Sequence, residues 1–135
     1  MTSPNLLADW TTPQPFALPE LGPGVEGELR DQLEAALRHI AADAAVKALV
    51  LFGSRATGTA HPDSDLDLLV VERTPQLEPE AKVASWCRHF QPLQGLPLPV
   101  VLIVSGSADA ERLAGSRWHV ISEAVRQGRV LVVQP

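Results

Sequence analysis

The sequence predicts an α/β (α+β) domain in which a small mixed β-sheet is flanked by helices. Short apolar runs typical of buried strands alternate with segments of helical periodicity. The length of 135 residues fits one domain, and a hydrophobic content of 45% suffices for one core. We therefore expect one folded domain over residues 25–135, preceded by an arm over residues 1–24.

The arm is expected to be extended, because it contains five prolines, which fix the backbone and remove amide donors. It is also too apolar for a freely solvated tail. Its large apolar residues are Leu6, Leu7, Trp10, Phe16, Leu18 and Leu21. Two interpretations remain open: the arm covers the surface of its own domain, which is favoured, or it clasps a partner.

A helix is expected over residues 26–44, where apolar side chains recur at intervals of three and four. The run Val46–Phe52 is almost wholly apolar and predicts a buried strand that ends at Gly53. Residues 53–64 hold two glycines, a proline and several small polar side chains, so a loop or broken turn is expected there.

The second strand is expected over Asp65–Val71, where carboxylates and leucines first alternate. A helix follows over Glu80–Phe90, with Cys87 on its inner side as a small core residue and Trp86 as a packing residue. This helix carries the chain back across the sheet. The third strand should therefore run parallel to the second.

The third strand, Val100–Val104, is uncharged, as expected of a strand covered on both faces. Ile121 and Val125 are expected to face inward from the last helix. The remaining elements are a helical turn, a helix and a short strand, over residues 109–114, Trp118–Gln127 and Val130–Val133.

Charge and cysteine content exclude several classes of function. The net charge of −5 argues against a broad nucleic-acid-binding face. A single cysteine excludes an internal disulfide and a cysteine-rich zinc site. No apolar run is long enough to span a membrane, and no secretory signal is visible. These absences lead us to expect a cytoplasmic protein.

One stretch carries a strong chemical signal, the carboxylate pair Asp65 and Asp67. Side chains at i and i+2 of a strand project from the same face, so their charges repel. A divalent cation neutralises such a pair, and oxygen ligands of this kind suit Mg²⁺. Gly53 and Ser54 suit a phosphate, because glycine admits close approach and the serine can donate. Arg55 could add a charge-assisted bond.

The expected topology links these two pieces. If the first two strands are antiparallel neighbours, Ser54 leaves one strand where Asp65 enters the other. Phosphate donors and metal carboxylates then meet at one edge of the sheet, an arrangement that suits phosphoryl or nucleotidyl transfer. Acidic residues near turns are more often merely solvated, but Gly-Ser followed by Asp-x-Asp between two apolar strands is a far more specific pattern.

The run GSRATGTAHPDSDLDLLV closely resembles the signature of the minimal nucleotidyltransferases of the DNA polymerase beta-like superfamily. The later segments LPVVLIV and HVISEAVRQGRVLV resemble the family's third strand and its closing helix and strand. The resemblance covers about residues 46–133. It implies the nucleotidyltransferase fold, with Gly53 and Ser54 holding a nucleoside triphosphate such as ATP and Asp65 and Asp67 binding Mg²⁺.

The same resemblance suggests a partner. Many small members resemble antitoxins paired with an all-helical HEPN protein, and some inactivate that partner by attaching AMP. The leading interpretation is therefore an antitoxin-type enzyme that transfers AMP to a hydroxyl, with the HEPN-type partner as the acceptor. A homo-oligomer is the other association considered.

One departure puts catalysis in doubt. The family commonly supplies a third carboxylate from the third strand, and its place here is taken by Val101. Valine can neither bind a metal nor accept a proton, so enzymatic activity is left open. The rival interpretation is a catalytically impaired module that neutralises a partner by contact. A small-molecule nucleotidyltransferase is less favoured, because no second domain is available to hold an acceptor.

Overall fold

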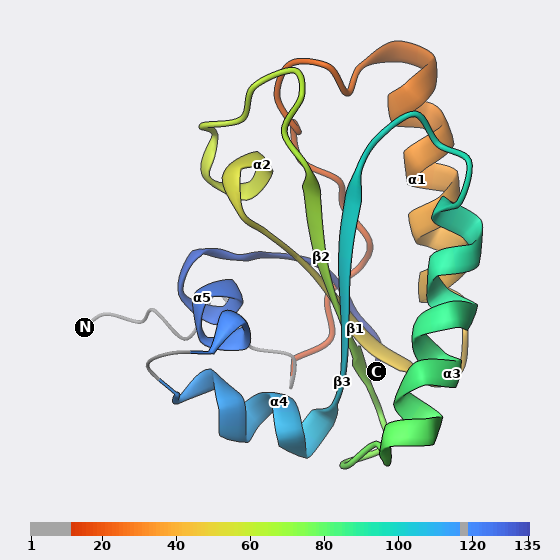
Figure 1. The fold of residues 1–135 in the computed structure, drawn as a ribbon, viewed down its shortest axis with the longest axis vertical. Coiled ribbons are helices and arrows are strands. Elements are labelled where there is room, and N and C mark those ends of the chain that lie inside the picture. The colour runs from red at the N-terminus through yellow and green to blue at the C-terminus, as the bar shows by residue number, and fades with distance from the viewer. Residues whose placement is uncertain (1–11, 117–118) are drawn as a thin grey trace.

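The computed structural model describes residues 12–116 and 119–135, apart from the side chains of residues 123 and 125. Its centre is a four-stranded mixed sheet in the order β3-β2-β1-β4 (Figure 1). The strands are β1 (Val46–Phe52), β2 (Leu66–Glu72), β3 (Val100–Gly106) and β4 (Arg129–Val133). Strand β1 runs antiparallel to both β2 and β4, and β2 runs parallel to β3. The expected fold class and strand directions are confirmed.

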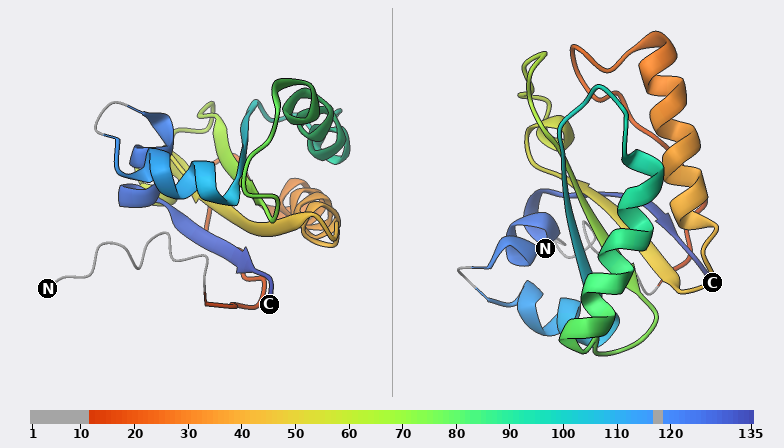
Figure 2. Two further views of the ribbon diagram at one scale, coloured as in Figure 1. Left: turned by 90° about the horizontal axis from the view of Figure 1, so that it is seen from below. Right: turned by 45° about the vertical axis from the view of Figure 1, so that its right-hand side comes forward.

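Helices cover both faces of this sheet, and the two pairs lie on opposite sides of it (Figure 2). One pair is α1 (Gly27–Ala41) and α3 (Pro79–Phe90), which is followed by a 3-10 turn, η2 (Gln91–Leu93). The other pair is α4 (Ser107–Ala114) and α5 (Val120–Gln127). Alternate residues of each strand face the two layers, so two separate apolar clusters fill the core. None of the described helices is long and apolar enough to cross a membrane.

The described part of the arm lies on its own domain, as the favoured interpretation expects. Gln14 exchanges backbone hydrogen bonds with Val133, and the amide of Ala17 donates to the carbonyl of Leu131. The arm therefore runs beside the outer edge of β4 (Figure 2). Leu21 is 1% exposed and belongs to the core cluster under α1. Residues 1–11 lie outside the described part of the chain.

Three sequence expectations are wrong in detail. The loop expected over residues 53–64 contains a one-turn helix, α2 (Ser54–Thr57). Cys87 is exposed rather than buried, because Ser85 and His89 supply the buried face of α3. Strand β3 is an edge strand and is not covered on both faces, since 42% of Val101 is exposed.

Other expectations are met or fall outside the described residues. Trp86 packs as expected: its ring stacks on Phe90 at 4.7 Å between centroids, and its Nε1 donates to the carbonyl of Leu102. Ile121 faces the core between α5 and the sheet. Trp118 and the side chain of Val125 lie outside the described residues.

The packing of Leu21 predicts that residues 12–24 contribute to stability. Leu21→Ala should lower the free energy of unfolding by about 2–5 kcal/mol, the usual cost of truncating a buried leucine. The neighbouring exposed residue provides a control, since Glu20→Ala should change stability by less than about 0.5 kcal/mol. Urea denaturation of the full chain measures both values. Equal midpoints for the two variants would contradict the placement of the arm.

Candidate functional site

The candidate site is built by the β1–β2 pair, whose register brings Phe52 opposite Asp67. Because the strands are antiparallel, the residues that follow β1 lie at the same end of the sheet as those that precede β2. Gly53 and Ser54 therefore share this end with Asp65 and Asp67. Figure 1 shows α2 and the loop that follows it at this end of the two strands.

Gly53 approaches Asp67 so closely that a side chain at residue 53 would displace the carboxylate. Its φ is +75°, a left-handed value that disfavours side chains, and an added Cβ would overlap the Asp67 carboxylate. The backbone of Gly53 therefore forms one wall against which this carboxylate lies. Ser54 follows directly, as the first residue of α2, and is partly exposed.

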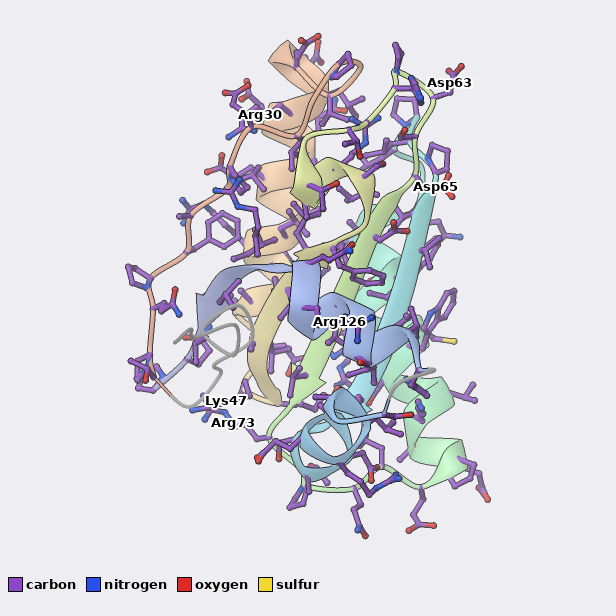
Figure 3. The ribbon with its side chains drawn as sticks, turned by 90° about the vertical axis from the view of Figure 1, so that its left-hand side faces the viewer. Arg30, Lys47, Asp63, Asp65, Arg73 and Arg126 are labelled. Carbon is purple, nitrogen blue, oxygen red and sulfur yellow. The ribbon has the colours of Figure 1, made fainter. Side chains whose placement is uncertain are left out.

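Asp67 projects on the sheet face that α4 and α5 cover further along the strands, and Asp65 directly precedes β2. Leu69, two residues on from Asp67, packs in the core cluster on that face. Asp65 is exposed and Asp67 is half-buried. Figure 3 shows Asp65 near one end of the sheet and Lys47 and Arg73 near the other, with Asp63 further out on the loop.

Strand β3 places Val101 beside this pair. Val101 is the register partner of Asp67 in the parallel β2–β3 ladder, so both side chains lie on one face. The expected position of the missing third carboxylate is therefore next to Asp67 in space. Among the described residues, no group of three or more histidine, cysteine, aspartate or glutamate side chains could hold a metal ion.

Comparison with known proteins places this chain in a family. Residues 30–127, more than half of the chain, match the family described as "Nucleotidyltransferase domain". The chain belongs to the nucleotidyltransferase domain family. The expected nucleotidyltransferase fold is thereby confirmed. A comparison with curated proteins found no match.

Solved structures resemble this nucleotidyltransferase domain at low identity. A toxin–antitoxin crystallised with AMP-PNP is 23% identical, with a TM-score of 0.45 over 75% of this chain and 70% of that one. A candidate nucleotidyltransferase from Sulfolobus solfataricus is 21% identical, with a TM-score of 0.46 over 64% and 82%. A mutant of the toxin–antitoxin MntA-HpeT is 21% identical, with a TM-score of 0.45 over 75% and 70%. Because all three TM-scores are below 0.5, the family match alone places the chain.

Nucleotidyltransferase domains generally use a nucleotide and a divalent metal, so the site residues should include ligands for such a metal. Two carboxylates at the start of β2, one of them held against the backbone of Gly53, are a donor set that suits one hard divalent cation. With Val101 beside Asp67, the described residues offer no third carboxylate for a second cation.

Arg55 is buried, which the sequence did not indicate. Its side chain is 1% exposed, and its guanidinium donates to main-chain carbonyls of the arm and of the loop before β2. The guanidinium is thus turned away from solvent in the nucleotidyltransferase domain. A contact between Arg55 and a phosphate stays a prediction, and one that this arrangement of the side chain does not favour.

A charged cluster at the far end of β2 also escaped sequence reasoning, because its members are distant in the chain. Glu72 is buried and lies 2.7 Å from Nε2 of His89, and Arg88 donates to it at 3.0 Å. Arg88 also bonds Asp43. Burial opposes ionisation of Asp43, but hydrogen bonds from the Ala45 amide and from Arg88 outweigh it and hold its pKa below the ordinary value. Glu72 bonds two residues of α3 and lies at the end of β2 away from Asp67, so it cannot replace the missing carboxylate.

The contact between Gly53 and Asp67 predicts a specific effect of a methyl group. Gly53→Ala should abolish Mg²⁺-dependent nucleotide binding, because its Cβ displaces the Asp67 carboxylate. Gly58→Ala is the matched control: Gly58 also has a positive φ, +83°, but its Cβ would meet nothing within 4 Å. Both variants should lose about 1–2 kcal/mol of stability from backbone strain. Calorimetric titration with Mg-ATP measures the affinity of each variant. Equal affinities would show that the contact between Gly53 and the Asp67 carboxylate does not matter for binding.

Proposed function

We propose that this nucleotidyltransferase domain binds a Mg²⁺–nucleoside triphosphate, with ATP as the expected substrate, at the end of the β1–β2 pair. Gly53 and Ser54 hold the triphosphate, and Asp65 and Asp67 hold the metal. The observation that supports this proposal is the Asp67 carboxylate lying against the backbone of Gly53, because the proposed metal ligand is then next to the residues proposed to bind phosphate.

Each residue has a defined part in this proposal. The absence of a side chain at Gly53 lets a phosphate approach the backbone, and the Ser54 hydroxyl donates to a phosphate oxygen. Asp65 and Asp67 supply carboxylate oxygens from the start of β2, and hard oxygen ligands of this kind suit a divalent cation. When bound, Mg²⁺ supplies charge neutralisation for the phosphates.

We propose an antitoxin-type role in the cytoplasm, with a HEPN-type helical protein as partner and acceptor. In this reaction a partner hydroxyl oxygen forms a bond to the α-phosphorus of ATP, the bond from that phosphorus to the α–β bridging oxygen breaks, pyrophosphate leaves, and the hydroxyl proton passes to solvent water. The proposal is supported by the motif around Gly53 and Asp67 and by membership of the nucleotidyltransferase family. A small-molecule acceptor is the less favoured alternative.

A second candidate function is favoured by one observation, the valine beside Asp67. The departing hydroxyl proton needs an acceptor, and Val101 cannot be one. Loss of general-base assistance lowers a rate by roughly 10²–10⁴-fold. The alternative is therefore a nucleotide-binding module that transfers AMP very slowly or not at all and neutralises its partner by contact.

The carboxylate pair can be tested by binding alone. Asp65→Asn combined with Asp67→Asn should abolish the Mg²⁺-dependent part of ATP binding, because neutral amides no longer need a cation. Asp63→Asn is the control, since it removes one negative charge from the exposed loop just before the site. Calorimetry with and without Mg²⁺ gives the difference. An unchanged Mg²⁺ dependence in the double variant would reject the metal site.

The position of Val101 predicts a gain of function. Val101→Asp should raise the rate of AMP transfer to the purified helical partner, because it restores a carboxylate beside Asp67. Val120→Asp is the control, a valine of similar exposure, 40%, on α5. Label transfer from α-labelled ATP measures the rate. Rapid transfer by the unmodified chain would show that another residue accepts the proton.

A further inference from the structure

We propose that Arg55 is a positioning residue, whose guanidinium ties the arm to the loop before β2 and so fixes the position of Asp65, which directly precedes that strand. It does not contact the nucleotide. The consequence for binding rests on the proposed function of the Gly53–Asp67 site. The tie itself can be measured without any nucleotide.

The evidence is the full set of bonds that this side chain makes. All three guanidinium nitrogens donate to main-chain carbonyl oxygens. On the arm, Nη1 donates to Leu21 at 2.8 Å and to Pro23 at 3.0 Å. On the loop, Nη2 donates to His61 at 3.2 Å, Pro62 at 3.4 Å and Ser64 at 3.0 Å, and Nε donates to Ser64 at 3.2 Å.

This pattern requires a guanidinium. Burying a cation is costly unless its donors are satisfied, and the planar fork of arginine directs five N–H groups toward several acceptors at once. A lysine at position 55 has only three donors on one atom. It would keep the charge but could not reach both the arm and the loop, so it would loosen the tie.

Backbone packing reinforces the same junction. Gly24 lies against the loop so closely that an added Cβ would meet the carbonyl oxygen of Pro62 at 2.6 Å. At Gly22 an added Cβ would meet the Cβ of Ala60 at 3.2 Å. Two glycines of the arm thus leave room for the loop, and Arg55 bridges the two segments beside them.

Residues of the proposed site are direct neighbours, in the chain, of the residues that Arg55 joins. Arg55 follows Ser54 in the chain, and its acceptor Ser64 precedes Asp65. One side chain therefore sets the distance between the residues proposed to hold the phosphate and those proposed to hold the metal. This explains why the arginine next to Ser54 is buried and bonded to main-chain carbonyls.

The experiment compares Arg55→Lys with Arg30→Lys in the full chain. Arg30 is a matched control, because its guanidinium also braces the arm, donating to the carbonyls of Pro19 and Leu18 at 2.8 Å, but does not reach the loop. Hydrogen exchange is followed without nucleotide at the loop amides of His61 and Ser64, which bond within the loop. Arg55→Lys should speed their exchange about tenfold, and Arg30→Lys should leave it unchanged.

A second readout separates positioning from direct contact. Under conditions where each protein is folded, Arg55→Lys should weaken Mg-ATP binding by about tenfold and change the affinity for Mg²⁺-free ATP by less than about twofold. Loss of both affinities to the same extent would show that the guanidinium contacts phosphate. If the unmodified chain binds no Mg-ATP, the proposed function fails, but the exchange rates still decide whether Arg55 holds the loop.

Two further variants cover the case in which Arg55→Lys does not fold. Gly24→Ala leaves Arg55 in place but pushes the arm away from Pro62. Gly27→Ala is its control, because Gly27 also has a positive φ, +59°, but an added Cβ there would meet nothing within 4 Å. Loop exchange should rise in the first and not in the second. Wild-type loop exchange in a folded Arg55→Lys protein, or in Gly24→Ala, would overturn the proposal.

Discussion

The close approach of Gly53 to Asp67 is the constraint on which the rest of the site depends. It follows from the register that pairs Phe52 with Asp67, and it leaves no space for a side chain at residue 53. A carboxylate is thereby held where the chain turns out of β1. The residues proposed to hold metal and phosphate therefore lie next to one another. Arg55 then limits how far the intervening loop can move from them.

Much of the fold could be predicted because the apolar pattern of each strand is strong. The bounds of β1 were predicted to the residue. The parallel direction of β3 followed from the crossover helix α3, whereas the antiparallel pairing of β1 and β2 was assumed and is confirmed by their register. Edge position was harder to predict. Strand β3 is uncharged like a central strand, but no further strand pairs with its outer side among the described residues. The inner face of α3 was assigned wrongly, because its buried residues include the polar Ser85 and His89.

The site was predictable where neighbours in the sequence are neighbours in space. Gly53, Ser54, Asp65 and Asp67 belong to one motif, so their common location could be inferred. The surroundings of Arg55 could not, because its acceptors are main-chain carbonyls up to 34 residues away and carbonyls leave no trace in a sequence. The same holds for the cluster around Glu72. Val101 lies between these cases. The sequence alone showed that valine replaces the third carboxylate, but the strand register was needed to show that it lies beside Asp67.

The central claim is that the Asp65–Asp67 pair holds a metal ion beside a triphosphate bound at Gly53 and Ser54. A crystal of the full chain grown with Mn²⁺ and a non-hydrolysable ATP analogue tests it directly, because anomalous scattering locates the metal. The account predicts one manganese between the two carboxylates, with phosphate oxygens completing its shell and contacting residues 53 and 54. A nucleotide and manganese bound elsewhere, or a carboxylate pair left without metal at saturating ligand, would contradict it.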